Sequence, residues 1–169
     1  MSLFPLVAWE RIENRLADEA LSVWGHYLGP CNRPFGKQSF GLYVLQQLAA
    51  VAVSASPVPT SCAGIPRKQI VELARLCAHP DHRDMTRVAL RLWRKTACAE
   101  WSREYWPVTA YVSYARKDLH TGDIYRFDGW ERAKDARASV VTAGSHHSTP
   151  GPIHAKSVWV WRLTEEAKL

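Results

Sequence analysis

Side chains that can move a proton or contact a substrate lie in two short segments. His120 follows a predicted strand and precedes a predicted helix, and an imidazole titrates near neutral pH, so it is our first candidate for a proton carrier. Ser113 and Tyr114 alternate along that strand, so one should face a cleft and the other the core, and we assign the cleft to Ser113. His26 and Tyr27 lie in a loop with Gly and Pro, and we expect them to form the opposite wall.

Two charged residues interrupt the largely apolar segment 69–78. Glu72 and Arg75 are three positions apart, so a regular strand places them on opposite faces. One of them must point at the cleft or at solvent, because an unpaired buried charge is expensive. The spacing leaves open which one, and both are candidates for substrate binding.

A basic surface is the third candidate. The chain has 22 Lys and Arg against 16 acidic residues, a net charge of +6, which makes a polyanionic partner plausible. Several of these cations lie near one another on and before a predicted helix, with little acid between them. We expect that surface to contact nucleic-acid phosphates. Its members are Arg83, Arg87, Arg91, Arg94 and Lys95.

The elements that must position these residues follow from periodicity and turn signals. They indicate an α/β (α+β) domain spanning residues 1–169, with a mixed, mostly antiparallel central sheet flanked by helices. We expect helices over 6–24, over 85–101 and over a short segment ending at Gly129. We expect strands over 40–44, 48–53, 69–78, 108–114 and 157–163, and a loop over 136–152.

Other features of the sequence limit the expected cellular location and the kinds of metal or disulfide site. No stretch approaches the roughly 18 apolar residues of a membrane span, and no secretory leader is evident, so we expect a cytoplasmic protein without a membrane partner.

His146 and His147 lie in a predicted loop, with His154 nearby. Adjacent residues aim in different directions and no carboxylate accompanies them, so we predict no metal site. The cysteines form no C-x-x-C pair, which indicates neither a zinc ribbon nor a disulfide framework; they are Cys31, Cys62, Cys77 and Cys98.

Residues 72–95, ELARLCAHPDHRDMTRVALRLWRK, resemble the core motif of GNAT acyltransferases, a strand followed by a turn and a helix. In that family a glycine-rich loop at the turn holds the pyrophosphate of acetyl-CoA through backbone N–H groups. Residues 84–88, Asp-Met-Thr-Arg-Val, stand where those glycines belong, and Asp84 adds a negative charge there. Acetyl-CoA use is therefore doubtful on this interpretation, and the group donor stays unknown.

Residues 112–130, VSYARKDLHTGDIYRFDGW, resemble a segment of phage Mom-type DNA-modification proteins, and residues 26–29 resemble their upstream "HYxG" element. That family is similar to GNAT proteins in fold and converts the adenine N6-amino group of DNA to a carbamoylmethyl derivative. The matching positions in the longer segment are Ser113, Tyr114, Ala115, His120, Gly122, Ile124, Tyr125 and Trp130.

The resemblance implies roles for these positions. Many GNAT enzymes carry a tyrosine at the place of Tyr125 that protonates the leaving thiolate, although core packing is an equal alternative. Asp118 could supply the carboxylate that the Mom-type pattern has at Arg116. The implied catalytic residues are His26, Tyr27, Ser113, Asp118, His120 and Tyr125, and the implied substrate contacts are Glu72, Arg75, Tyr114 and Trp130.

Together these features predict a Mom-type enzyme acting on double-stranded DNA, encoded by a phage or mobile element and protecting its DNA from restriction; a homodimer is compatible with this hypothesis. Two alternatives stay open. One is a conventional acetyl-CoA-dependent N-acetyltransferase for a small amine or a protein. The other is a catalytically inactive module that only binds nucleic acid.

Overall fold

The computed structural model describes residues 6–133, 139–141 and 151–164. A seven-stranded sheet has the order β1-β2-β3-β6-β7-β11-β8, and its neighbouring strands are antiparallel except β6 and β7, which are parallel. The predicted α/β domain with a mixed, mostly antiparallel sheet is confirmed. The sheet strands are β1 Val7–Ile12, β2 Lys37–Val44, β3 Gln47–Ala55, β6 Ile70–Ala78, β7 Ala110–Arg116, β8 Glu131–Arg132 and β11 Lys156–Arg162.

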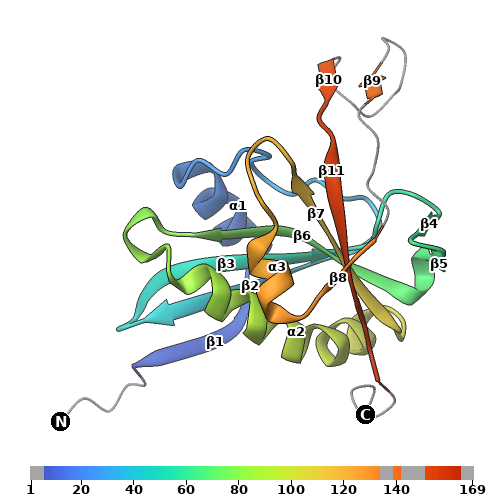
Figure 1. Ribbon diagram of the computed structural model, residues 1–169. Helices are drawn as coiled ribbons and strands as arrows, with labels where there is room; N and C mark the ends of the chain where they lie inside the picture. Colours follow the sequence, from blue (N-terminus) through green and yellow to red (C-terminus); the bar gives the residue numbers. More distant parts are fainter. Residues whose placement is uncertain (1–5, 134–138, 142–150, 165–169) are drawn as a thin grey trace.

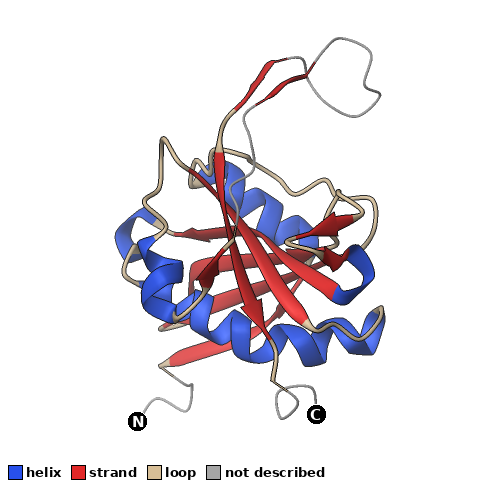
Figure 2. Cartoon of the chain, turned by 45° about the vertical axis from the view of Figure 1, so that its right-hand side comes forward, coloured by secondary structure: helices blue, strands red, loops and turns tan. Residues whose placement is uncertain are grey.

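Helices cover both faces of the sheet (Figures 1 and 2). The three α-helices are α1 Asn14–Val23, α2 Met85–Glu104 and α3 Asp123–Asp128. Alternate residues of β3 point to opposite sides: Val51 and Val53 pack in a cluster with α1, whereas Ala52 packs in a cluster with Trp93 of α2. The α2 cluster holds most of the buried aromatic rings, so this side of the sheet contains the larger core.

The predicted helix over 6–24 is wrong in its first half. Residues Val7–Ile12 form the edge strand β1, paired antiparallel with β2, and Trp9 stacks on Phe40 with the ring centroids 5.5 Å apart. Apolar residues at 6, 9 and 12 fit a helical period, but their edge position next to β2 decides the structure. Tertiary packing overrides local periodicity here.

Four further strands, besides the two-residue β8, were not expected. β9 Ser139–Val141 pairs antiparallel with β10 Gly151–Ile153, in and just beyond the predicted loop 136–152, and the short strands β4 Ser61–Cys62 and β5 Ile65–Pro66 pair with each other. His146 and His147 lie outside the described residues. The other predicted strands and helices are present with shifted ends, and Gly129 ends α3 with φ 93°, as a C-cap glycine does.

A β-bulge interrupts β6. Val53 of β3 is opposite Arg75 while the next residue, Ser54, is opposite Leu73, so Ala74 is an extra residue in β6. Ala74 therefore joins the α1 cluster, and the strand resumes its alternation one step out of phase.

The bulge corrects the expectation that Glu72 and Arg75 lie on opposite faces. Both side chains interact with the loop that follows α1: Glu72 binds Arg33, and Arg75 donates to the carbonyls of Gly29 and Pro30. They therefore share one face of β6. A regular strand would have separated them, and no local pattern of residues indicates the extra one.

Two short η turns complete the chain path, Arg67–Gln69 before β6 and Pro80–His82 before α2. No helix in the described part of the chain is long and apolar enough to cross a membrane.

Gly122 allows a test of how α3 is fixed. It precedes α3 with φ 81°, and a Cβ there would overlap the indole of Trp159. Gly122→Ala should lower the free energy of unfolding by about 2–5 kcal/mol, because backbone strain and a clash add. Gly64→Ala is the matched control: Gly64 has φ 77° but open space around it, so only strain of about 1–2 kcal/mol is expected. If urea unfolding gave the same loss of unfolding free energy for both variants, the clash with Trp159 would be contradicted.

Candidate functional site

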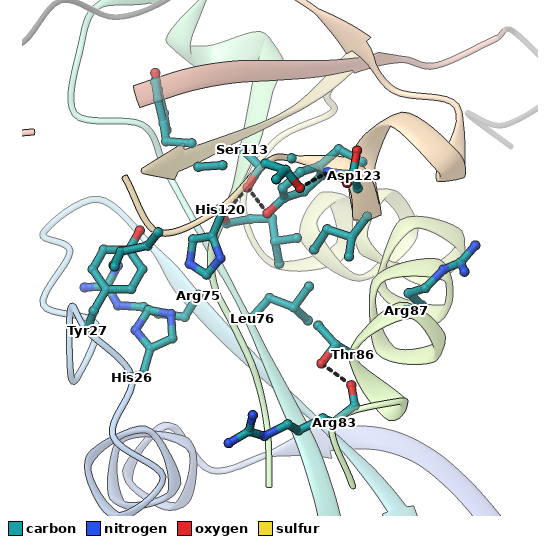
Figure 3. A pocket seen from close by; sticks show the side chains of 18 of the residues that line it. His26, Tyr27, Arg75, Leu76, Arg83, Thr86, Arg87, Ser113, His120 and Asp123 are labelled. Carbon is teal, nitrogen blue, oxygen red and sulfur yellow. Dashed lines mark hydrogen bonds between the residues drawn. The ribbon is translucent and has the colours of Figure 1, made fainter. Parts of the chain in front are cut away.

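A pocket of about 560 Å³ opens where β6 and β7 separate. The two strands pair from Ile70 opposite Ala110 to Leu73 opposite Ser113, and beyond this point both continue without pairing to each other. The pocket is lined by Leu73–Leu76 of β6, by 113–115 of β7, by the beginning of α2, by 119–125, and by His26 and Tyr27 (Figure 3).

A pair of hydroxyl groups lies at the point of separation. Ser113 Oγ donates to the carbonyl of Leu73 at 3.1 Å and lies 2.9 Å from the hydroxyl of Tyr125. Because Ser113 has one proton and gives it to Leu73, Tyr125 is the donor in their mutual bond. Burial raises the pKa of Tyr125 to about 12, so its hydroxyl stays protonated at neutral pH.

The position of Tyr125 is compatible with both roles that the sequence left open, and its part in chemistry stays a prediction. Its ring packs in the core, 5.7 Å from Trp159 and 5.4 Å from Trp130 between ring centroids, while its hydroxyl is at the pocket. Trp130, predicted as a substrate contact, is 4% exposed within the core and is not among the residues that line the pocket. Its indole N–H donates to Asp128.

The rings of His26 and Tyr27, which we expected to form one wall, line the pocket next to the ring of His120. His26 stacks on Tyr27 with centroids 4.9 Å apart, and Tyr27 lies 5.8 Å from His120 (Figure 3). Nδ1 of His26 accepts the backbone N–H of Leu28 at 3.2 Å, so the neutral imidazole carries its proton on Nε2 and is a donor there. Burial, then the charge of Arg75, then His120 lower the pKa of His26 to about 4.

Asp118 lies outside the residues that line the pocket. Its carboxylate is held by Arg116, whose guanidinium lies over the Tyr27 ring, 5.2 Å from the centroid, and it also lies 3.5 Å from His154. The hydrogen bond from Arg116 lowers the pKa of Asp118 to about 2. The structure thus places Asp118 as the partner of Arg116. In the described part of the chain no three His, Cys, Asp or Glu side chains come together as a metal site would require.

Tyr114 and Glu72 project from the face of the sheet opposite to Ser113. The Tyr114 hydroxyl donates to Sγ of Cys62 at 3.1 Å, and burial raises the pKa of Tyr114 well above its usual value. Glu72 is 3% exposed, and burial raises its pKa while Arg33 opposes the shift. Arg33 is a residue that the sequence analysis missed; the loop between α1 and β2 carries it with no motif around it.

The predicted basic surface divides into two groups. Arg83 and Arg87 line the pocket at the beginning of α2. Arg91 and Arg94 instead bind the carboxylate of Asp128, at 3.4 and 2.8 Å. Arg94 also lies 3.9 Å from the centroid of the Trp161 ring, so it ties α2 to the core, while Lys95 is exposed. Nucleic-acid binding by this surface stays a prediction.

Comparison with solved structures assigns the architecture. An acetyltransferase from Salmonella typhimurium that modifies the N-terminal serine of ribosomal protein L7/L12 superposes with a TM-score of 0.61 at 7% identity, covering 96% of this chain and 98% of that one. The ribosomal-protein-S18-alanine N-acetyltransferase from Escherichia coli gives 0.60 at 12% identity, covering 92% and 93%. The fold is that of the GNAT acetyltransferases. No protein-family model matches the sequence, and no curated protein matches it.

The same comparison corrects the expectation that acetyl-CoA use is doubtful. A GNAT acetyltransferase from Elizabethkingia anophelis with acetyl-CoA bound has a TM-score of 0.52 at 10% identity, covering 94% of this chain and 99% of that one. A Bacillus subtilis acetyltransferase in complex with CoA is also similar, with a TM-score of 0.51 at 12% identity and coverage of 94% and 99%. Glycines are absent at residues 84–88, but Arg83 and Arg87 place two positive charges on the same pocket wall as Asp84.

The low pKa of His26 predicts a dependence of stability on pH. Since the folded pKa is about 4 and the free value is 6.5, the unfolded chain takes up the proton first as the pH falls. Protonation of His26 therefore costs the folded protein no stability above pH 6.5. The free energy of unfolding decreases as the pH falls from 6.5 toward about 4. Because the ring is partly exposed, we expect a loss of only about 1–2 kcal/mol between pH 7 and 5.

His26→Asn keeps an acceptor for the backbone N–H of Leu28 but has no imidazole to protonate. Urea unfolding of this variant at pH 7 and at pH 5 should lack the loss of about 1–2 kcal/mol that is expected from His26. Proton NMR of the wild-type imidazole checks the cause directly. A titration midpoint near the free value of 6.5 would contradict this account.

Proposed function

We propose that this protein is an acetyl-CoA-dependent N-acetyltransferase that acts on a small amine or a protein amine. The observation that carries the proposal is the pocket at the separation of β6 and β7. It joins the beginning of α2 to the Ser113–Tyr125 hydroxyl pair and to the His26–Tyr27–His120 wall. The fold neighbours, which include N-acetyltransferases acting on ribosomal proteins, support it.

The residues around the beginning of α2 fit a phosphate-bearing donor. The first turn of a helix presents unpaired N–H groups and a partial positive charge, and Arg83 and Arg87 add full charges on the same pocket wall. Asp84 on that wall opposes them, but it is exposed to solvent and its repulsion is screened. When bound, acetyl-CoA supplies an acetyl group activated as a thioester.

Two protein groups can handle the protons of the transfer. His120 lines the pocket, and we assign it to take the amine proton as the amine nitrogen forms its bond to the acetyl carbon and the carbon–sulfur bond breaks. Tyr125 holds a phenolic proton at the base of the pocket and can give it to the departing sulfur. Exchange with water then restores both side chains.

Tyr125→Phe tests this assignment because it keeps the ring and its packing. We expect acetyl transfer, measured by thiol release, to fall about 100-fold with little change in the affinity for acetyl-CoA. Tyr43→Phe is the matched control, since Tyr43 lies on β2 and does not line the pocket, and it should have wild-type activity. Full activity in Tyr125→Phe would remove the hydroxyl from the mechanism. Failure to bind acetyl-CoA in calorimetry would refute the proposed donor.

A second candidate differs in its acceptor, adenine N6 in double-stranded DNA, with a carbamoylmethyl or acetamido-like group transferred. It is favoured by the convergence of the Mom-like positions on one pocket: His26, Tyr27, Ser113, His120 and Tyr125. Tyr27 would stack on a base that is turned out of the helix. The fold neighbours favour the first candidate.

Mass spectrometry of nucleosides separates the candidates. Plasmid DNA from cells expressing the protein should gain mass on adenine only under the second candidate, and His120→Ala should reduce that gain at least about 100-fold. His82→Ala, on the turn before α2 and outside the pocket, is the control with unchanged modification. Unmodified adenine with active wild-type acetyl transfer would refute the second candidate.

A further inference from the structure

An unbalanced group of charges adjoins the pocket on the face of the sheet that carries Glu72. Arg33 binds this one carboxylate, and Arg75 shares its face of β6. Lys156 lies on β11 in the same alternation as Val158 and Val160, which pack with Val112, the partner of Glu72 on β7. Burial raises the pKa of Glu72, and the charges of Arg33, Arg75 and Lys156 all lower it. We call these four residues the cationic cluster. It holds three positive charges against one negative charge.

Each member is substantially withdrawn from solvent. Glu72 is 3% exposed and Arg75 is 9% exposed. The side chain of Arg33 is 20% exposed, and Lys156 is half-buried on β11. Withdrawn charges are normally paired, because desolvation of an unpaired ion costs several kcal/mol. A surplus of about two positive charges therefore needs an explanation.

The contacts within the cluster do not remove the surplus. Oε1 of Glu72 accepts from Arg33 at 2.7 Å, whereas Oε2 is buried without a hydrogen-bond partner. Arg75 donates only to the backbone carbonyls of Gly29, Ala74 and Pro30, which carry no net charge.

Within the described residues no further acid supplies the missing charge. The side-chain ammonium of Lys156 forms no hydrogen bond or ion pair there, and its pKa is lowered by burial, with Glu72 opposing the shift. Asp118 is already engaged by Arg116.

The cluster reaches the pocket through one of its members. Arg75 lines the pocket, as Tyr27 does. The Nε2–H of His26 is a further donor on the same wall. This end of the pocket therefore offers donors and positive charge, which suits an oxyanion and disfavours a cationic amine.

We infer that the acceptor carries an oxyanion, a phosphate or a carboxylate, that binds at Arg75 and Lys156 while its amine lies in the pocket. The inference rests on the proposed function in one respect only: that function makes the bound ligand the acceptor of the acetyl group. The positive end would exclude polyamines and other polycationic acceptors, because like charges repel in a partly desolvated site. Arg33 then acts as a positioning residue that holds Glu72.

Inorganic phosphate is the probe, since its binding needs no acetyl transfer. At constant ionic strength, about 50 mM phosphate should shift the Arg75 Nε–H NMR signal saturably, as a millimolar oxyanion site requires. Lys156→Met should weaken phosphate binding about tenfold, or roughly 1.4 kcal/mol. It should also raise the melting temperature in phosphate-free buffer, because it removes an uncompensated charge.

Two control variants separate this site from others. Lys68→Met removes an exposed lysine, and Arg87→Ala removes a cation of the proposed donor wall; both should bind phosphate at Arg75 like the wild type. Propionate in place of phosphate shows which oxyanion is preferred, and binding of either supports the inference. An unmoved Arg75 signal with both probes, or wild-type affinity in Lys156→Met, overturns it. Loss of phosphate binding in Arg87→Ala alone would place the anion at α2 and also overturn it.

Discussion

The hydroxyl of Ser113 bridges the two strands at the last point where they are paired. It donates to the carbonyl of Leu73 on β6 and accepts from Tyr125 on α3, so one oxygen connects two strands and a helix. Beyond this bridge the strands separate and the pocket begins. The position of the Tyr125 hydroxyl, the depth of the pocket and the distance to the imidazole wall all depend on where that separation starts.

Local signals in the sequence identified most elements and much of the site. The period of the α2 segment, the glycine that ends α3 and the β-branched and aromatic residues of β7 each reflect short-range constraints. His26, Tyr27, Ser113, His120 and Tyr125 were all expected at the site, and they line one pocket.

What the sequence did not reveal depends on partners distant in the chain. Apolar spacing before Glu13 fits a helix as well as a strand, and only pairing with β2 decides between them. The phase of β6 depends on its register with β3, so Glu72 and Arg75 were assigned to different faces. Lys156 was not considered at all, because its place beside Glu72 arises only when β11 joins the sheet next to β7.

The extra residue at Ala74 makes the length of β6 as important as its composition. If Ala74 were paired with a residue of β3 instead of being the extra residue, strict alternation would turn Arg75 toward the face occupied by Trp93 and Tyr125. A guanidinium among aromatic rings would lose its three carbonyl acceptors, and the wall that carries His26 would lose its cation. We therefore expect a one-residue insertion in β3 between Val53 and Ser54, which would give Ala74 a partner, to be less well tolerated during evolution than many substitutions at the same positions.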